Sequence, residues 1–344
     1  MSLQDLSKLY RTSILPIITY SCGAWFMNSG DPRNAWNINK THLDVLGKLQ
    51  YRCLLNISGA MQGTSEEVLL KELFINPIEV DLARMATVQR TRVLHDPETT
   101  AAVKFRELCR TGTSSSDLHA HPLAALRRID LVFEQHICAT TKDDSWKFKH
   151  LRAKAISRFA KKEATLESKN RWDAYRRSRV ARGKDIPPAL QEGYVHEWGK
   201  EVLQCYAGLT RAQSTMLLHL RTGHIGLHAN LHARHVSIFS SAAMIFADHW
   251  VQCSPTKTDR CPCGDGKHTA KHLFLYCKRL AKERAELERT VRHLHMPALL
   301  TTHAFASTDW AIRFFHIPQY DSYKRDLQFD RPKQHPHGSH EDGT

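Results

Sequence analysis

Cysteine and histidine gather in one short polar stretch near the carboxyl end of this 344-residue chain. Residues 260–277 read RCPCGDGKHTAKHLFLYC, which gives the spacing Cys261-x-Cys263-x8-His272-x4-Cys277. Three thiolates and one imidazole complete a tetrahedron around zinc, and four protein ligands leave no open position at which water could be activated. The spacing therefore predicts a structural Zn²⁺ site; the alternative is a chance cluster of cysteines beside a helical histidine.

Two further residues leave the ligand set open. His268 could replace His272, and Cys253 could supply a spare thiolate. Gly264, directly after the second cysteine, allows a tight turn that aims backbone N–H groups at the sulfurs. Thr269 is expected to cap the helix that presents the histidine ligand.

Charge and composition restrict the class of partner. Lys and Arg number 49 against 35 for Asp and Glu, a net charge of +14, which favours a polyanion. No apolar run approaches 18 residues and residues 1–10 lack a signal-peptide core, so no membrane partner is expected. The other cysteines are scattered singly among apolar neighbours, which favours a reducing compartment, the nucleus or the cytoplasm.

Apolar periodicity predicts a mainly helical fold. From Thr41 apolar residues recur at three- and four-residue steps as far as Ser58-Gly59, which predicts one helix, and Thr64 with Glu67 predicts a capping box for the next. The apolar stretch 9–26 is ambiguous between strand and helix.

Leucine recurs every seven residues after the cysteine cluster. This spacing predicts a helix that could serve as an oligomer seam, although Arg284 at an intervening core position argues against a long coiled coil. The four positions are Leu273, Leu280, Leu287 and Leu294.

Residues 146–184 are strongly basic, with fourteen Lys and Arg and only three acidic residues. We predict that this stretch neutralises phosphates and that Trp172 and Tyr175 stack on bases. The alternative is a solvated helix face with two buried aromatic residues. The predicted phosphate contacts are Lys154, Arg158, Lys161, Lys162, Arg171, Arg176, Arg177, Arg179 and Arg182.

Three stretches accompany the cysteine cluster in a fixed order. Residues 9–26 read LYRTSILPIITYSCGAWF, residues 49–82 contain SGAMQGTSEEVLLKELFINPIEVDL, and residues 213–231 read QSTMLLHLRTGHIGLHANL. With the Cys-x-Cys-Gly pair, the His-x4-Cys pair and Arg284, they resemble the C-terminal region of non-LTR retrotransposon reverse-transcriptase polyproteins of the LINE type, especially fungal Tad-like elements. Cys22 departs from that family, which more often runs Tyr-Gly directly.

The resemblance implies thumb and post-thumb helices that grip a template–primer duplex, followed by a basic segment and a CCHC zinc knuckle that track RNA template or target DNA during target-primed reverse transcription. The predicted parts are residues 1–110, a thumb/post-thumb-like helical module; 111–145, a linker; 146–250, a basic helical segment; 251–296, the knuckle with its following helix; and 297–344, a C-terminal helix and a disordered tail.

No residue of this chain is expected to catalyse polymerisation. The Asp143-Asp144 pair lies in a polar stretch that is typical of a helix start, and residues 128–146 are too short for an RNase H domain. His224 lies among histidines without a nearby carboxylate, so a histidine-lined helix face, or a phosphate contact by Arg221, is a stronger interpretation of the LRTGH stretch than a catalytic centre.

These observations predict a zinc-dependent nucleic-acid-binding fragment without polymerase, endonuclease or RNase H active sites. The alternative is a truncated part of a full-length RNA-directed DNA polymerase polyprotein. Neither the choice between RNA and DNA nor the oligomeric state follows from the sequence.

Overall fold

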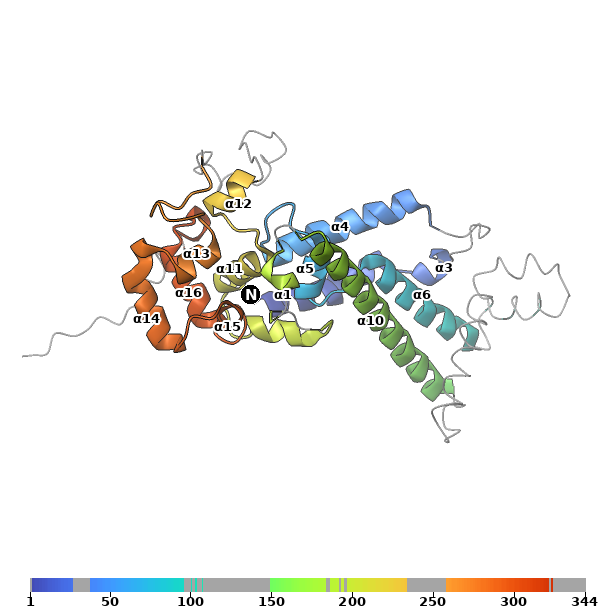
Figure 1. Cartoon of the computed structure of the whole chain (residues 1–344). Coiled ribbons are helices and arrows are strands. Elements are labelled where there is room, and N and C mark those ends of the chain that lie inside the picture. The colour runs from blue at the N-terminus through green and yellow to red at the C-terminus, as the bar shows by residue number, and fades with distance from the viewer. Residues whose placement is uncertain are drawn as a thin grey trace, which may run out of the picture. The chain divides into compact units, whose positions relative to one another are not determined.

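The computed structural model describes residues 2–26, 38–95, 149–183, 186–191, 193–194, 197–233 and 258–321, together with residues 100, 103, 107 and 323. Over these residues the chain is helical, and the extended pairing among them is the single β-bridge between Arg260 and Lys267. The prediction of a mainly helical fold is confirmed. The chain divides into two compact units, residues 1–207 and 208–344 (Figure 1).

Unit 1 is built from helices of very different lengths. They are α1 (Leu3–Leu9), the π-helix η1 (Tyr10–Ile14), α2 (Leu15–Ile18), α3 (Cys22–Trp25), α4 (Lys40–Ser58), α5 (Glu66–Glu72), α6 (Ile78–His95), α10 (Lys149–Ala181) and the 3₁₀ helices η3 (Pro188–Leu190) and η4 (Lys200–Tyr206).

The ambiguous apolar stretch 9–26 is helical. Pro16 is the second residue of α2, which continues directly from the π-helix η1, and Ser21 turns the chain with a φ of 50° before α3. Tyr10 is fully buried, and its hydroxyl accepts a hydrogen bond from Gln50 Nε2 at 2.9 Å. This contact joins the first helical segment to α4.

The ends of α4 and α5 show how local sequence sets helix boundaries. α4 ends at Gly59, whose φ of 68° is the left-handed conformation that glycine adopts without strain, so the predicted end is confirmed. The cap of α5 lies one residue later than predicted. Ser65 Oγ accepts from Val68 N at 3.4 Å, whereas Thr64 Oγ1 is turned to Met61 O at 2.6 Å.

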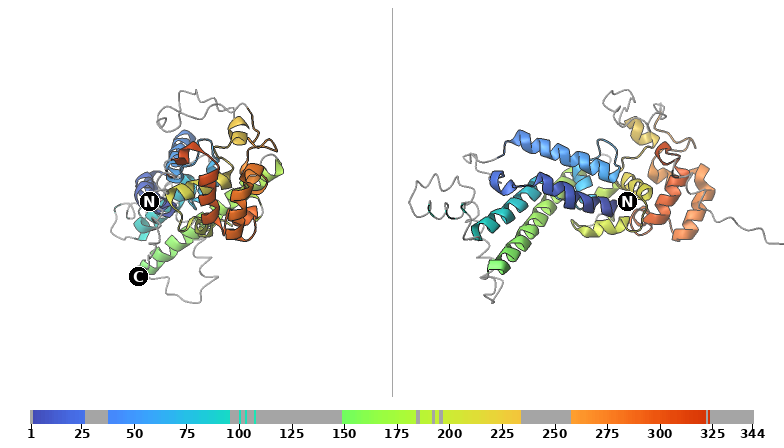
Figure 2. Two further views of the ribbon diagram at one scale, coloured as in Figure 1. Left: turned by 90° about the vertical axis from the view of Figure 1, so that its left-hand side faces the viewer. Right: turned by 180° about the vertical axis from the view of Figure 1, so that it is seen from behind.

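α6 and α10 run side by side and make the most extensive helix contact of unit 1 (Figure 2). The buried positions of α10 recur every four residues, and the small side chains among them let two helix backbones approach closely. Ser168 Oγ also bonds Asn76 Oδ1 at 3.0 Å, just before α6. The buried stripe consists of Ile156, Ala160, Ala164, Ser168 and Trp172.

Unit 2 contains shorter helices. They are α11 (Arg211–Thr222), α12 (His228–Ala233), α13 (Ala270–Leu275), η6 (Lys278–Leu280), α14 (Ala281–Val291), α15 (Met296–Leu299), α16 (Ala304–Phe314) and η7 (Pro318–Tyr320).

An aromatic cluster forms part of the core of unit 2. The ring of Phe274 on α13 stacks on Trp310 of α16 with centroids 5.3 Å apart, and meets Phe315 edge-on at 5.1 Å. Trp310 Nε1 donates to Glu283 O at 3.0 Å, which ties α16 to α14. Because Phe274 is completely buried, this cluster holds α13 in place.

The leucines spaced seven residues apart do not share one helix, so that prediction is wrong. α13 ends at Leu275 and α14 spans Ala281–Val291, with a turn and η6 between them. Leu273 and Leu287 are buried in the core of unit 2. The interruption removes the continuous seam that a coiled coil requires.

The division into compact units differs from the predicted boundaries. The basic helix α10 belongs to unit 1 because its buried stripe packs against α6, and the segment that follows it is broken into η3, η4, α11 and α12. The predicted linker 111–145, the Asp143-Asp144 pair, Cys253 and the predicted tail lie outside the described residues. Within the described part of the chain, no helix combines the length and apolarity needed to cross a bilayer.

Candidate metal centre

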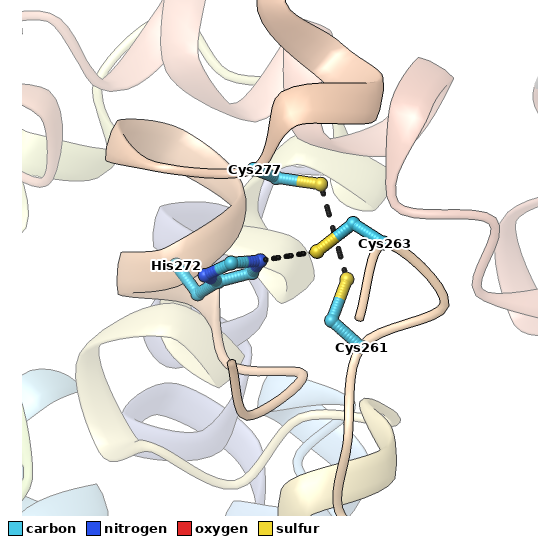
Figure 3. Close-up of side chains that lie close together, drawn as sticks. All are labelled: Cys261, Cys263, His272 and Cys277. Carbon is cyan, nitrogen blue, oxygen red and sulfur yellow. Dashed lines mark hydrogen bonds between the residues drawn. The ribbon is translucent and has the colours of Figure 1, made fainter. Parts of the chain in front are cut away.

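The structure brings the four predicted ligands together. The sulfurs of Cys261, Cys263 and Cys277 and a ring nitrogen of His272 all lie within 4.8 Å of one another, and their side chains point toward a common centre (Figure 3). The Cys261 and Cys277 sulfurs are 3.8 Å apart, and Cys263 Sγ lies 3.1 Å from His272 Nε2. These residues could hold one metal ion.

The two measured separations can be compared with a tetrahedral zinc site. Two sulfurs about 2.3 Å from zinc stand about 3.8 Å apart, which is the distance found between Cys261 and Cys277. A sulfur and an imidazole nitrogen on the same ion stand about 3.6 Å apart, so Cys263 and His272 need to separate by about 0.5 Å. Three sulfurs and one imidazole are donors that suit zinc.

The turn after Cys261 presents the first two sulfurs. Gly264 has a φ of 85°, and its N–H donates to Cys261 O at 3.0 Å, which closes the turn. The next N–H, that of Asp265, donates to Cys263 Sγ at 3.5 Å. Cys261 N in turn donates to Gly266 O at 2.7 Å, so the loop folds back on itself, and the predicted role of the glycine turn is confirmed.

The other two ligands come from α13 and the residues just after it. Thr269 Oγ1 accepts from His272 N at 3.2 Å, which confirms the predicted cap. Both Tyr276 N and Cys277 N donate to His272 O at 2.8 Å, so one carbonyl oxygen holds the turn that places Cys277 opposite His272. Arg284 Nη1 donates to Cys277 O at 2.8 Å, which connects the ligand to α14.

The two thiols of the turn have opposite protonation tendencies. Hydrogen bonding from the backbone N–H of Asp265 lowers the pKa of Cys263 to about 7, whereas burial raises the pKa of Cys261 to about 12. Metal ligands must be thiolates, so a metal ion that binds here displaces the proton of Cys261.

His268 is engaged elsewhere, so the structure favours His272 as the ligand. His268 Nδ1 accepts a hydrogen bond from His228 N at 3.1 Å, and the two rings meet edge-on with centroids 4.4 Å apart. Burial, with smaller contributions from the charges of His228 and His272, lowers the pKa of His268 to about 4. The neutral ring can therefore accept that N–H at neutral pH.

Gly266 contacts the His272 ring, which the spacing of the Cys and His ligands does not predict. A Cβ at this position would lie 3.1 Å from His272 Nδ1 and 3.4 Å from Cε1, so the backbone of Gly266 packs against the ring of the ligand. A glycine three residues after the second cysteine is the only sequence signal for this contact.

Four of the predicted phosphate contacts form a single exposed face of α10. Lys154, Arg158, Lys161 and Lys162 are exposed and recur at steps of three and four residues. The buried stripe of α10, which begins at Ile156, lies on the opposite side over this part of the helix. We call these four side chains the basic face.

The other predicted basic contacts are partly occupied within unit 1. Arg171 forms ion pairs with Glu79 at 3.0 Å and Glu167 at 2.7 Å, and Arg176 Nε donates to Leu190 O at 3.0 Å. Arg177 and Arg182 are exposed but turn back to the carbonyls of their own helix, and Arg179 is half-buried.

The prediction that Trp172 stacks on bases is wrong. The Trp172 side chain is only 3% exposed because it continues the buried stripe of α10. Tyr175 is half-buried, stacks on Trp172 with centroids 6.0 Å apart, and shares a hydrogen bond of 2.8 Å with Ser65 Oγ. The alternative prediction, a helix with two buried aromatic residues, describes this part of α10.

Arg221 does not lie at a surface either, which corrects its prediction as a phosphate contact. It is 1% exposed, and Nη1 donates to Leu300 O at 3.0 Å. Its guanidinium therefore connects α11 to the end of α15 inside unit 2. His219, two residues earlier, is equally buried and shares a hydrogen bond of 3.2 Å between its Nδ1 and Tyr320 Oη.

Comparison of the chain with family models, with curated proteins and with solved structures gives no match. The geometry of the described residues is therefore the basis for a functional assignment.

Proposed function

We propose that this chain is a zinc-dependent nucleic-acid-binding module and that it corresponds to the C-terminal region of a LINE-type reverse-transcriptase polyprotein. The observation that carries the proposal is the convergence of Cys261, Cys263, His272 and Cys277 within 4.8 Å. The partner we propose is RNA template or target DNA, and the place of action is the nucleus or the cytoplasm.

Zinc has a structural role in this proposal. All four donors belong to the protein, so the ion has no open position for substrate or water. Its binding joins a turn at residues 261–266 to α13 and to the residues that follow it. We assign no catalytic residue to the chain, and polymerase chemistry would belong to other parts of a longer polyprotein.

The basic face supplies the attraction for phosphate. None of its four side chains forms an ion pair or a side-chain hydrogen bond with another described residue, so their charge is available to an external anion. Duplex and single-stranded nucleic acid both carry phosphates that Lys and Arg side chains can neutralise. α10 does not supply the aromatic side chains that would stack on bases, because Trp172 and Tyr175 pack within unit 1.

Metal analysis tests the zinc site directly. The purified chain should contain one zinc per molecule, and C261S and C277S should each lose it. C53S is the matched control, because Cys53 is a free cysteine on α4 outside the cluster, and it should keep full stoichiometry. Folded wild-type protein without zinc, or unchanged zinc in both cluster variants, would refute the site.

Salt titration tests the basic face. Replacing Lys154, Arg158, Lys161 and Lys162 with alanine should flatten the log–log dependence of affinity on salt by about 0.7 per lost contact with a single strand. The matched control replaces four exposed basic residues elsewhere in unit 1, with the same change in charge: Lys8, Lys40, Lys48 and Arg52.

Each result of the titration has a definite meaning. A flatter slope in the α10 variant alone supports the basic face. Equal losses in both variants would mean that binding follows net charge only, and an unchanged α10 variant would exclude the basic face from binding.

A further inference from the structure

A single large aromatic side chain beside the metal centre lies open to solvent. Tyr276 is 59% exposed, although two residues close to it in sequence are buried: Phe274 is 0% and Cys277 is 1% exposed. The aromatic core formed by Phe274, Trp310 and Phe315 does not include it. Tyr276 therefore presents an apolar ring at the surface without a packing partner among the described residues.

The position of Tyr276 is set by the metal site. It lies between His272 and Cys277, and its N–H donates to His272 O at 2.8 Å, the same oxygen that receives the N–H of Cys277. A metal ion that holds the two ligands therefore also holds the backbone from which this ring projects. Because the backbone at Tyr276 is already fixed before a ligand binds, less conformational entropy is lost when the ring contacts that ligand.

The residues nearest Tyr276 in sequence include several exposed cations. Lys271, Arg279 and Lys282 lie within six residues of it and are exposed, and none forms an ion pair with another described residue. Of the acids around it in sequence, Asp265 is paired with Lys278 at 3.3 Å, while Glu283, Glu286 and Glu288 lie on α14. From residue 265 to residue 288 there are six Lys and Arg against four Asp and Glu, so this part of unit 2 has a net positive charge that favours an anionic partner.

An exposed aromatic ring with cations on nearby positions fits one chemical class of ligand, an unpaired nucleobase flanked by phosphates. Bases stack on such rings with little sequence preference, and the cations follow the backbone. In a duplex the base faces are already covered by their neighbours, so a ring of this kind discriminates in favour of single strands.

We propose that Tyr276 is a stacking platform for an unpaired base at the surface of the metal centre, with Lys271, Arg279 and Lys282 at the flanking phosphates. This inference rests on the proposed nucleic-acid-binding function and specifies its substrate class as single-stranded. It assigns the stacking role to unit 2, whereas the sequence had suggested Trp172 and Tyr175 of α10.

The test uses the zinc-loaded full chain and a 20-nucleotide single strand that contains 2-aminopurine, whose fluorescence is quenched by stacking, beside a duplex of the same length. Y276A should bind the single strand about 5- to 150-fold more weakly and lose the quenching, which corresponds to one stacked base. Y276F and Y276W should retain both. Binding to the duplex should change less than twofold.

The control for the loss of an exposed aromatic is F305A, because Phe305 on α16 is 62% exposed. It should behave as wild type, and every variant should retain one zinc. A zinc-loaded Y276A that binds and quenches like wild type, or that loses single-strand and duplex binding equally, would overturn the inference.

Failure of the inference can be told apart from failure of the proposed function. Wild-type protein that binds neither nucleic acid refutes both. Wild-type protein whose binding depends on the basic face but not on Tyr276 refutes the stacking platform alone. Equal quenching by wild type and Y276A would likewise show that another residue stacks on the base.

Discussion

Replacing Gly266 with alanine changes the metal centre by one methyl group. The new Cβ would lie 3.1 Å from His272 Nδ1, whereas non-bonded heavy atoms are most favourably placed at about 3.5–4.0 Å. The imidazole must therefore move by about 0.4 Å or more to restore ordinary contact. Gly266 is not among the residues with a positive φ, so alanine adds no backbone strain and the effect is confined to the ring.

The expected result is weaker zinc binding in a folded protein. Changing an outer contact that orients a metal-bound histidine commonly costs about 10- to 100-fold in metal affinity, and we expect G266A, which pushes the His272 ring, to fall in this range. Competition with a chromophoric chelator measures the affinity, and the absorption of bound Co²⁺ reports the change in ligand geometry.

G47A provides a matched glycine control. Gly47 lies inside α4, and a Cβ there meets nothing within 4 Å. We expect unchanged zinc affinity and a gain of about 0.5–1 kcal/mol in the free energy of unfolding, because alanine is the better helix former. A G266A protein that binds zinc within twofold of wild type would refute the argument that the loop packs against the ligand.

Two further substitutions test buried polar groups. R221M should lower the free energy of unfolding by about 1.5–3 kcal/mol in urea denaturation, because Leu300 O loses a charged donor. It should leave the salt dependence of nucleic-acid binding unchanged. Weaker nucleic-acid binding by a variant of full stability would instead make Arg221 a contact to nucleic acid. Burial, together with the charge of Glu67, raises the pKa of Glu66 from 4.5 to about 7, so the folded state holds this proton more tightly than the unfolded state. The contribution of Glu66 to the free energy of unfolding is therefore fully present below pH 4.5 and is lost as the pH rises to about 7. E66Q should therefore be flatter than wild type over that pH range, and superimposable stability profiles would contradict the shift.

Local features of the chain could be predicted from the sequence because they depend on nearby residues. The end of α4 at Gly59, the turn at Gly264 and the cap at Thr269 each involve contacts within a few positions. The four ligands were also identified from their spacing. The capping position of α5 was missed by one residue because Thr64 and Ser65 are both hydroxyl residues, and the hydrogen bond of Thr64 to Met61 O decides between them.

Long-range contacts could not be predicted in the same way. Arg221 was expected at a surface, but its guanidinium reaches Leu300 O, 79 positions later, and no local pattern reveals that acceptor. Trp172 could have been recognised as buried, because it continues a four-residue repeat with Ala160, Ala164 and Ser168. The basic composition of the stretch reflects its exposed positions and does not show which residues of the helix are buried.

The hydrogen bond between His228 N and His268 Nδ1 links α12 to the loop that presents the metal ligands. If zinc steadies that loop, it also steadies the first residue of α12, forty positions away in sequence. Thermodynamic reciprocity then applies: any molecule that binds α12 more tightly when zinc is present must raise the affinity for zinc by the same factor. Zinc affinity, measured with and without a candidate partner, would thus report on events at α12.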